Sequence, residues 1–574
     1  MVFNLKLFTR SQKKEGEKDH LNKYFIPYIP LILLIIIVGV ISYYRLLIQI
    51  DIGPLSDTCD FLLNALYFSG QGVGYYDWTR PVFFPFLISL VFKLGFVSAT
   101  VAYVVDLLIY IFGLIGFYLI LNLHFNKIES FFGGLIYATF PNTILMLGLG
   151  FSDFTCGAFI IWAFYFLILA VKKNSKFFIL FFLFWTMAFL ARFNAGLIIF
   201  PVVLYIFMNK QKIKSYKYLG WGILASFLLI IPVLWFYQIE FGNVLSPFVD
   251  TFGATSRTFS PDYHPYNPDP LFYVERFFRY TGFQSVIITL LIIIGLSIYS
   301  VIRVKNQPEI KKKFMSIVNR EKRNLKFKLL IFIILTSIFV LTFGHIHYMA
   351  SEAILLAVGL VFFTLIKELN IKNIDLHLLV FSWFMVFFIF NSIYVIKSSR
   401  YFILMAPGVA YLLLLGLKIV FSELTVKFRK GNLIFPAFAL ILTVLILLST
   451  ASLLPSIEDG FQGTKVTNEK ISLASEWFIN YDQDYENKVI YSNLWPYLAW
   501  HLKTDVKIMF TFKNNQGYLG GVKDNTTFTP QDNLASNNYL VENNADYYFS
   551  SDEINLTSYR PIKQFGSLVI YERI

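Results

Sequence analysis

Long apolar runs separated by short polar segments make up most of the 574-residue chain. A helix of about 20 apolar residues crosses the roughly 30 Å hydrocarbon core of a bilayer. Two of the apolar runs, on either side of "LARFNAG" at 190–196, are short and predict tilted or broken helices. In all, the pattern predicts thirteen spans: 25–49, 98–122, 131–150, 153–171, 176–191, 195–208, 217–237, 282–302, 328–344, 349–366, 376–395, 401–421 and 432–454. We therefore expect a polytopic α-helical membrane protein.

The apolar run 80–96 is long enough for one more crossing, and loop charge decides against it. If this run does not cross and the tail 1–24 is cytosolic, the lysine-rich loops all face the cytosol, as the positive-inside rule requires. A crossing would turn every later loop outward. We expect 80–96 to be re-entrant or to lie along the outer surface, within a first outer loop at 50–97. The lysine-rich positions are Lys127, Lys172, Lys173, Lys176, Lys210 to Lys217, the loop 303–328, Lys367, Lys372 and Lys427 to Lys430.

The composition changes after Leu454, where Asn, Asp, Ser and Tyr become frequent. The runs "KVIYS", "DVKIMFTF", "ADYYFSS" and "SLVIYERI" predict short strands, and "NLWPYLAWHL" predicts a helix. We therefore expect a cytosolic tail at 1–24, a membrane domain at 25–454 and a small extracytoplasmic α/β domain at 455–574. Two N-glycosylation sequons, at Asn525 and Asn555, are compatible with that location.

Composition and cysteine count exclude several classes of protein. Hydrophobic residues make up 56% of the chain and charged residues 15%, which is not typical of a soluble globular domain. The net charge of +13 comes from lysines in short loops, so we expect membrane lipids as neighbours and no nucleic acid. Two cysteines, Cys59 and Cys156, exclude a disulfide framework and a thiolate-rich zinc site. A disulfide between them would tie the first outer loop to the bundle; two unpaired thiols are the alternative.

Two carboxylates follow the first predicted span in "LSDTCDFLLNALYF". Asp57 and Asp60 are three positions apart, so a helix here places both on one face. The apolar residues that follow, from Phe61 to Phe68, would form a side that lies on the membrane. The pair either forms part of a catalytic site or caps and solvates a surface helix.

Other polar residues are predicted at the same outer end of the bundle. An ionisable group at the membrane is costly and tends to be functional, although an arginine there can also snorkel to the interface. Two nearby histidines could ligate a metal or only form hydrogen bonds. The residues are Asp153, Arg192, His345, His347, Glu352, Arg400 and Tyr401.

The order of these short motifs resembles the GT-C superfamily of polytopic glycosyltransferases, in particular the protein O-mannosyltransferases and aminoarabinose transferases. The likeness covers roughly 25–454 and rests on a first-loop acid, a second outer acid and three segments: "YYDWTRPVFFPFLISLVFKLGF", "LARFNAGLIIFP" and "SSRYFILMAPGVAYLLLLG". Asp57 matches the first acid, Asp153 resembles the second, and Arg400 matches the arginine of the late "RY" motif. The mannosyltransferase branch commonly has Asp-Glu where this chain has Asp57-Thr58.

The resemblance implies an integral membrane enzyme that transfers a monosaccharide from a polyprenyl-phosphate carrier to a protein or glycolipid acceptor, with inversion. It implies Asp57 as the catalytic acid and Arg400 at the donor phosphate. From the residues themselves we also expect Asp60 as an alternative catalytic acid, and Arg192 and Tyr401 beside Arg400 at the phosphate. A divalent metal, Mg or Mn, would be held by Asp153, with His345, His347 and Glu352 as further candidates. The alternatives are a polytopic transporter, a lipid-linked glycan polymerase or ligase, and a non-catalytic envelope scaffold.

Overall fold

The structure is a computed structural model. It describes residues 28–72, 77, 80–245, 247–248, 266–306, 322–367, 373–427, 434–513, 516–518, 529–551 and 553–574. The predicted tail 1–24, the sequon at Asn525 and most of the basic loop 303–328 lie outside these ranges. The sequon residue Asn555 lies inside them and is exposed.

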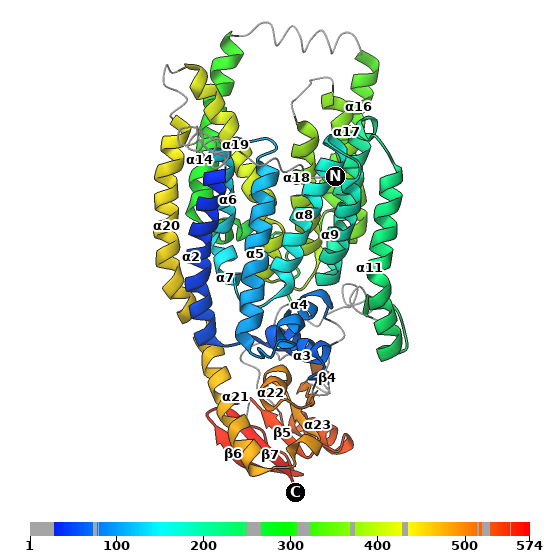
Figure 1. Ribbon diagram of the computed structural model, residues 1–574, viewed down its shortest axis with the longest axis vertical. Helices are drawn as coiled ribbons and strands as arrows, with labels where there is room; N and C mark the ends of the chain where they lie inside the picture. Colours follow the sequence, from blue (N-terminus) through cyan, green and yellow to red (C-terminus); the bar gives the residue numbers. More distant parts are fainter. Residues whose placement is uncertain are drawn as a thin grey trace, which may run out of the picture.

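A bundle of long helices forms the upper part of the molecule, and a small α/β domain lies at its lower end (Figure 1). Within the described ranges, nine helices are long and apolar enough to cross a membrane. They are α2 (Ile29–Ile52), α5 (Ala99–Leu121), α8 (Ser152–Lys172), α11 (Lys217–Phe241), α14 (Phe277–Asn306), α16 (Lys322–Thr342), α17 (Tyr348–Ile366), α18 (Ile374–Ile393) and α20 (Ile434–Gly460). The prediction of a polytopic helical membrane protein with a small C-terminal α/β region is confirmed.

Shorter helices form the other predicted spans. The run 131–150 is divided between α6 and α7. Within "ARFNAG" the chain breaks at the extended Arg192, between α9 and η2, where a broken helix is predicted. The exact count of thirteen crossings therefore stays a prediction. The remaining elements of the membrane domain are α6 (Lys127–Ala138), α7 (Pro141–Met146), α9 (Phe177–Ala191), η2 (Phe193–Ile198), α10 (Ile199–Met208), η3 (Lys210–Lys212), α13 (Phe272–Glu275), η5 (Ser399–Leu404) and α19 (Ala406–Lys427).

The first outer loop contains two helices, α3 (Ser56–Ser69) and α4 (Phe83–Phe92). Ten residues at 1.5 Å per residue give α4 a length of about 15 Å, about half of what a crossing needs. Both helices lie between the bundle and the C-terminal domain (Figure 1). The expected apolar side of α3 is present, but it does not lie on a membrane: Phe61, Leu62 and Leu66 are buried in one cluster with residues of α4, α5 and the C-terminal domain.

Helix α21 (Gln462–Tyr481) begins the C-terminal domain and connects it to α20. Its five-stranded sheet has the order β2-β1-β5-β7-β6, in which β1 is parallel to β2 and β5, and β7 is antiparallel to β5 and β6. The predicted strands and helix are present. Sequence reasoning missed β6, whose polar "YRPIKQF" leaves most side chains exposed, and it missed α21, β4 and α23. The elements are η7 (Tyr485–Asn487), β1 (Ile490–Ser492), α22 (Trp495–Leu502), β2 (Val506–Ile508), β3 (Thr511–Lys513), β4 (Gln516–Tyr518), α23 (Pro530–Glu542), β5 (Tyr547–Ser550), β6 (Tyr559–Phe565) and β7 (Leu568–Arg573).

The C-terminal domain holds the turn between α2 and α3. The side-chain amide of Asn468, on α21, donates hydrogen bonds to the carbonyls of Ile52 (3.1 Å) and Pro54 (2.9 Å). Gly53 between them has a left-handed φ of 85°, and a Cβ there would lie 2.8 Å from the Asn468 amide nitrogen. The turn that starts α3 is therefore fixed from outside the membrane domain.

Candidate active site

Helix α3 presents Asp57 and Asp60 to one arginine, Arg80, which lies just before α4. Arg80 Nη2 is 2.6 Å from Asp57 Oδ1 and 2.7 Å from Asp60 Oδ2. Asp77 is a third partner, with its Oδ2 3.2 Å from Arg80 Nε. The shared helical face predicted for the two acids is therefore present, and it is directed at a cation whose role the sequence did not reveal.

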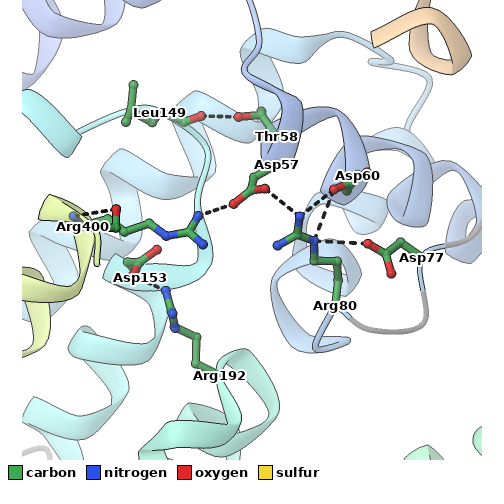
Figure 2. Close-up of polar contacts among 10 residues, drawn as sticks. Asp57, Thr58, Asp60, Asp77, Arg80, Leu149, Asp153, Arg192 and Arg400 are labelled. Carbon is green, nitrogen blue, oxygen red and sulfur yellow. Dashed lines mark hydrogen bonds and ion pairs between the residues drawn. The ribbon is translucent and has the colours of Figure 1, made fainter. Parts of the chain in front are cut away.

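Arg400 contacts Asp57 from the opposite side. Its Nη1 bonds Asp57 Oδ2, so each oxygen of this carboxylate has a guanidinium partner (Figure 2). Both side chains are partly exposed, 23% for Arg400 and 22% for Asp57, so the pair borders open space. The Arg400 Nε, in contrast, is buried and has no hydrogen-bond partner among the described residues.

The segment that carries Arg400 is anchored to several helices. Asn142 of α7 donates to the Ser399 carbonyl at 2.8 Å, and the Tyr273 hydroxyl of α13 donates to the Ser398 carbonyl at 3.0 Å. Lys397 is buried, and its ammonium donates to carbonyls at the end of α18, Asn391 O and Ser392 O. Arg400 is therefore held at a defined place by the fold.

A second ion pair lies beside the first. Asp153, in the first turn of α8, bonds Arg192, the residue that ends α9. The guanidinium carbons of Arg192 and Arg400 each lie 5.4 Å from the centroid of the Tyr401 ring. Figure 2 shows Asp153 next to Arg400, so acids and arginines alternate across the site. All five residues predicted for the catalytic and phosphate sites thus meet in one place, and the predicted metal ligand Asp153 lies with them. The other three metal candidates, His345, His347 and Glu352, do not join them.

The two acids of α3 differ in their electrostatics. Burial by itself would raise the pKa of the Asp57 carboxyl, but Arg80 and Arg400 outweigh it and hold the pKa of Asp57 well below its ordinary value. At Asp60, burial is the largest effect and adds to the neighbouring Asp77 and Asp57, which raises the pKa of Asp60 to about 7 despite Arg80. Asp57 is therefore ionised at neutral pH, whereas Asp60 exchanges its proton near neutrality.

Asp106 is a buried acid that the sequence analysis did not select, and it supports the site from α5. Asp106 of α5 is fully buried, and its Oδ2 accepts the backbone N–H groups of Gly148 (3.1 Å) and Gly150 (3.4 Å). Between these glycines, the Leu149 carbonyl accepts a hydrogen bond from Thr58 Oγ1 at 2.7 Å. The loop 147–151 therefore connects Asp106 to the neighbour of Asp57. A single acid in an apolar span was the signal that could have identified it.

Arg45 of α2 is the second missed residue. It is fully buried and donates to the carbonyls of Ile144 and Leu145, each at 3.3 Å, at the end of α7. It therefore holds the end of α7, from which the loop 147–151 continues, against α2. As with Asp106, a charge inside a predicted span was the available signal.

The four predicted metal ligands do not form one site. Asp153 is engaged by Arg192, and His347 accepts the Met349 N–H at the start of α17. His345 is exposed in the same turn, and Glu352 is buried beside residues of α10 and α18. In the part of the chain that the structure describes, no three His, Cys, Asp or Glu residues are placed to hold an ion. This donor set does not fit a divalent metal, because the site carboxylates are already bound to guanidinium groups.

The two cysteines are buried free thiols. Burial, followed by the nearby Asp60, raises the pKa of the Cys59 thiol well above its ordinary value. Of the two alternatives given for Cys59 and Cys156, a disulfide or two unpaired thiols, the structure has the two unpaired thiols.

Part of the chain matches a known protein family. Residues 79–236, which include Arg80, Asp153 and Arg192, match the family model of dolichyl-phosphate-mannose-protein mannosyltransferase. No curated protein matches the sequence.

Two solved structures share the fold over most of the chain. ArnT from Cupriavidus metallidurans, bound to undecaprenyl phosphate, is 11% identical with a TM-score of 0.53, and the match covers 95% of this chain and 98% of ArnT. The archaeal oligosaccharyltransferase AglB from Archaeoglobus fulgidus, in complex with an inhibitory peptide and a dolichol-phosphate, is 12% identical with a TM-score of 0.51, and the match covers 92% of this chain and 70% of AglB. At these identities the likeness concerns the fold. The chain therefore has the fold of the GT-C superfamily, and the family match and the fold together support a membrane glycosyltransferase of GT-C type.

Proposed function

We propose that this protein transfers one sugar from a polyprenyl-phosphate carrier to a protein or glycolipid acceptor at the outer face of the cell membrane. The observation that carries the proposal is the position of Asp57 between Arg80 and Arg400, at the end of the helical bundle that adjoins the C-terminal domain. The lipid phosphates named with ArnT and AglB support this class of donor.

The donor phosphate binds at Arg400 and Arg192. Both guanidinium groups face the Tyr401 ring, and Arg400 also lies 5.5 Å from the centroid of Phe151, so stacking orients them. A planar guanidinium can contact two phosphate oxygens at once, which suits it to the negative charge that develops on the leaving phosphate. The polyprenyl chain remains in the bilayer while its phosphate reaches the end of the bundle.

Asp57 accepts the proton of the acceptor. In the transfer step the acceptor oxygen forms a bond to the anomeric carbon, and the bond from that carbon to the phosphate oxygen breaks. The electron pair leaves with the polyprenyl phosphate, and the acceptor proton passes to the carboxylate. A single displacement of this kind inverts the anomeric configuration. Asp60 assists by sharing Arg80 with Asp57.

We assign no step to a divalent metal. Neutralisation of the phosphate, which a metal would supply in a carboxylate-rich site, falls to the arginines here. The predicted orientation, with a cytosolic N-terminus and an extracytoplasmic C-terminal domain, is part of the proposal because it brings the acceptor to the side of the site that borders the domain.

The test is a transfer assay with purified protein and a panel of radiolabelled polyprenyl-phosphate sugars, each offered with peptide and glycolipid acceptors. The proposal expects one donor to label an acceptor and to release free polyprenyl phosphate. Absence of transfer from every donor, by protein shown to be folded, would contradict it.

A further inference from the structure

The arrangement around Asp57 gives Arg400 two competing partners. Before any donor binds, Asp57 has Arg80 on one carboxylate oxygen and Arg400 on the other. A carboxylate held by two guanidinium groups is a weak base, because both cations stabilise its ionised form. The same Arg400 is the cation that the proposed function assigns to the donor phosphate.

Arg400 as found shares its guanidinium with Asp57. Its Nη1 is used by Asp57, and its Nε is buried and has no hydrogen-bond partner among the described residues. A two-point grip on a phosphate needs two neighbouring N–H groups of one guanidinium. Such a grip uses either the Nη1–Nη2 edge, where the phosphate meets the nitrogen that Asp57 already occupies, or the Nε edge, which the side chain must move to expose. On either edge the phosphate competes with Asp57 for Arg400.

We propose that Arg400 exchanges Asp57 for the donor phosphate, so that donor binding converts Asp57 from a neutralised ion-pair partner into the active base. The inference rests on the proposed function and adds an order to it: the donor binds first, and the acceptor is deprotonated afterwards. Before the donor arrives, the base is held inactive by the group that will bind the donor.

The remaining charges around Asp57 favour this exchange. Asp60, Asp77 and Arg80 lie on the side of α4, Asp153 of α8 lies beside Arg400, and Tyr497 of α22 faces Asp57 from the C-terminal domain. When Arg400 turns to the phosphate, Arg80 remains on Asp57 and prevents an unpaired buried charge. Asp153 remains near Arg400 and helps to keep it charged.

The exchange predicts that a variant without the Asp57 carboxylate loses transfer activity but binds the lipid phosphate more tightly than the wild type. In Asp57→Asn the competing carboxylate is absent, so the affinity for polyprenyl phosphate should rise about 10-fold, within the usual range of coupling between two sites. Binding of polyprenyl phosphate alone is measured on the full chain in detergent. Asp57→Ala should give the same gain and serves as a second variant if the first one does not fold.

Two controls separate exchange from a general loss of negative charge. At about pH 8, where Asp60 is ionised, Asp60→Asn removes a nearby charge without releasing Arg400, so its affinity should change by no more than about twofold, as expected for a partly screened neighbouring charge. In an Arg400→Gln background, Asp57→Asn should bring no gain. Equal gains in Asp57→Asn and Asp60→Asn, a gain that persists without Arg400, or unchanged or weaker binding in Asp57→Asn would each overturn the exchange.

Failure of the exchange is distinguishable from failure of the proposed function. Wild-type transfer together with unchanged binding in Asp57→Asn would overturn the exchange alone. The predicted binding pattern without transfer from any polyprenyl-phosphate sugar would overturn the proposed function and leave the competition for Arg400 intact.

Discussion

Arg400 bonds Asp57 across 343 positions of the sequence. The first residue belongs to η5, near the end of the membrane domain, and the second belongs to α3, directly after the first span. The contact forms only when the whole bundle has closed around the site. It joins the group proposed to accept a proton to the group proposed to hold the leaving phosphate.

The pH dependence of transfer should separate the roles of Asp57 and Asp60. The pKa of Asp60 is raised to about 7, so Asp60 carries its proton below that pH and loses it above. The pKa of Asp57 is held well below its ordinary value, so Asp57 is ionised both below and above the pKa of Asp60. With Asp57 as the base, kcat/KM should vary by no more than about threefold between about pH 6 and about pH 8.

The opposite assignment predicts another profile. With Asp60 as the base, kcat/KM would fall about tenfold for each pH unit below the pKa of Asp60, because only the ionised form accepts a proton. Asp60→Asn is the matched control, since it should remove any small rise near pH 7 and keep most of the activity.

Gly150 tests the loop that joins Asp106 to Thr58. A Cβ at Gly150 would lie 2.9 Å from Thr58 Cγ2, and the φ of Gly150 is 76°. Gly150→Ala should displace Thr58 and with it Asp57, and lower transfer by about 10-fold or more, because small errors in the position of a reacting group are costly. Transfer and thermal unfolding are measured together.

Gly70, at the end of α3, provides a matched control. Its φ of 81° is also left-handed, but a Cβ there would meet no atom within 4 Å. Gly70→Ala should therefore destabilise by a similar strain of about 1–2 kcal/mol without lowering transfer. Equal activity in the two variants would show that the loop does not position Asp57.

Asn468 tests the hold of the C-terminal domain on α3. Asn468→Ala removes the donor that the carbonyls of Ile52 and Pro54 share, which should cost about 1–3 kcal/mol and lower kcat as α3 loses its fixed start. Asn480→Ala is the control, because that exposed amide donates within α21 to the Glu476 carbonyl. The same kcat in the two variants would show that Asn468 only stabilises the fold and does not position α3 for catalysis.

The orientation of the molecule can be tested by labelling in intact cells. A cysteine introduced at the exposed Asn555 of the C-terminal domain should react with an impermeant thiol reagent. A cysteine at the exposed Lys173, in the loop after α8, should not react until the cells are opened. The native thiols, Cys59 and Cys156, are buried and give little background. The reverse pattern would place the proposed site on the cytosolic face.

The sequence predicted the helical membrane fold well because bilayer thickness imposes a length and a composition on each span. It also placed Asp57, Asp153, Arg192 and Arg400 at one end of the bundle, since loop charge orders the ends. The sequence did not predict which acids pair with which arginines. That Arg80 contacts both acids of α3 depends on how the chain before α4 folds back onto α3. The apolar side of α3 was assigned to the membrane because a one-dimensional pattern does not distinguish lipid from a protein partner.

The separation of the predicted metal ligands and the role of Asp106 both depend on three-dimensional structure. The proposed metal ligands were grouped because their loops share an end of the bundle, but side-chain direction separates them: Glu352 points between α10 and α18, and Asp153 towards Arg192. The candidate residues come from the predicted outer loops and span ends, and Asp106 lies inside a predicted span. It was therefore not among them. Its partners are two backbone N–H groups, and these cannot be recognised before the loop 147–151 is folded.

The central claim, that Asp57 is the base, is tested most directly by the transfer rate of Asp57→Asn. The asparagine keeps the shape of the side chain and can still hydrogen-bond, but it cannot accept the proton. General-base catalysis predicts a loss of roughly 100-fold to 10,000-fold, measured on folded, detergent-purified protein with the identified donor. Asp60→Asn, measured beside it, should lose much less. Near wild-type transfer in Asp57→Asn, or a large loss confined to Asp60→Asn, would contradict the account.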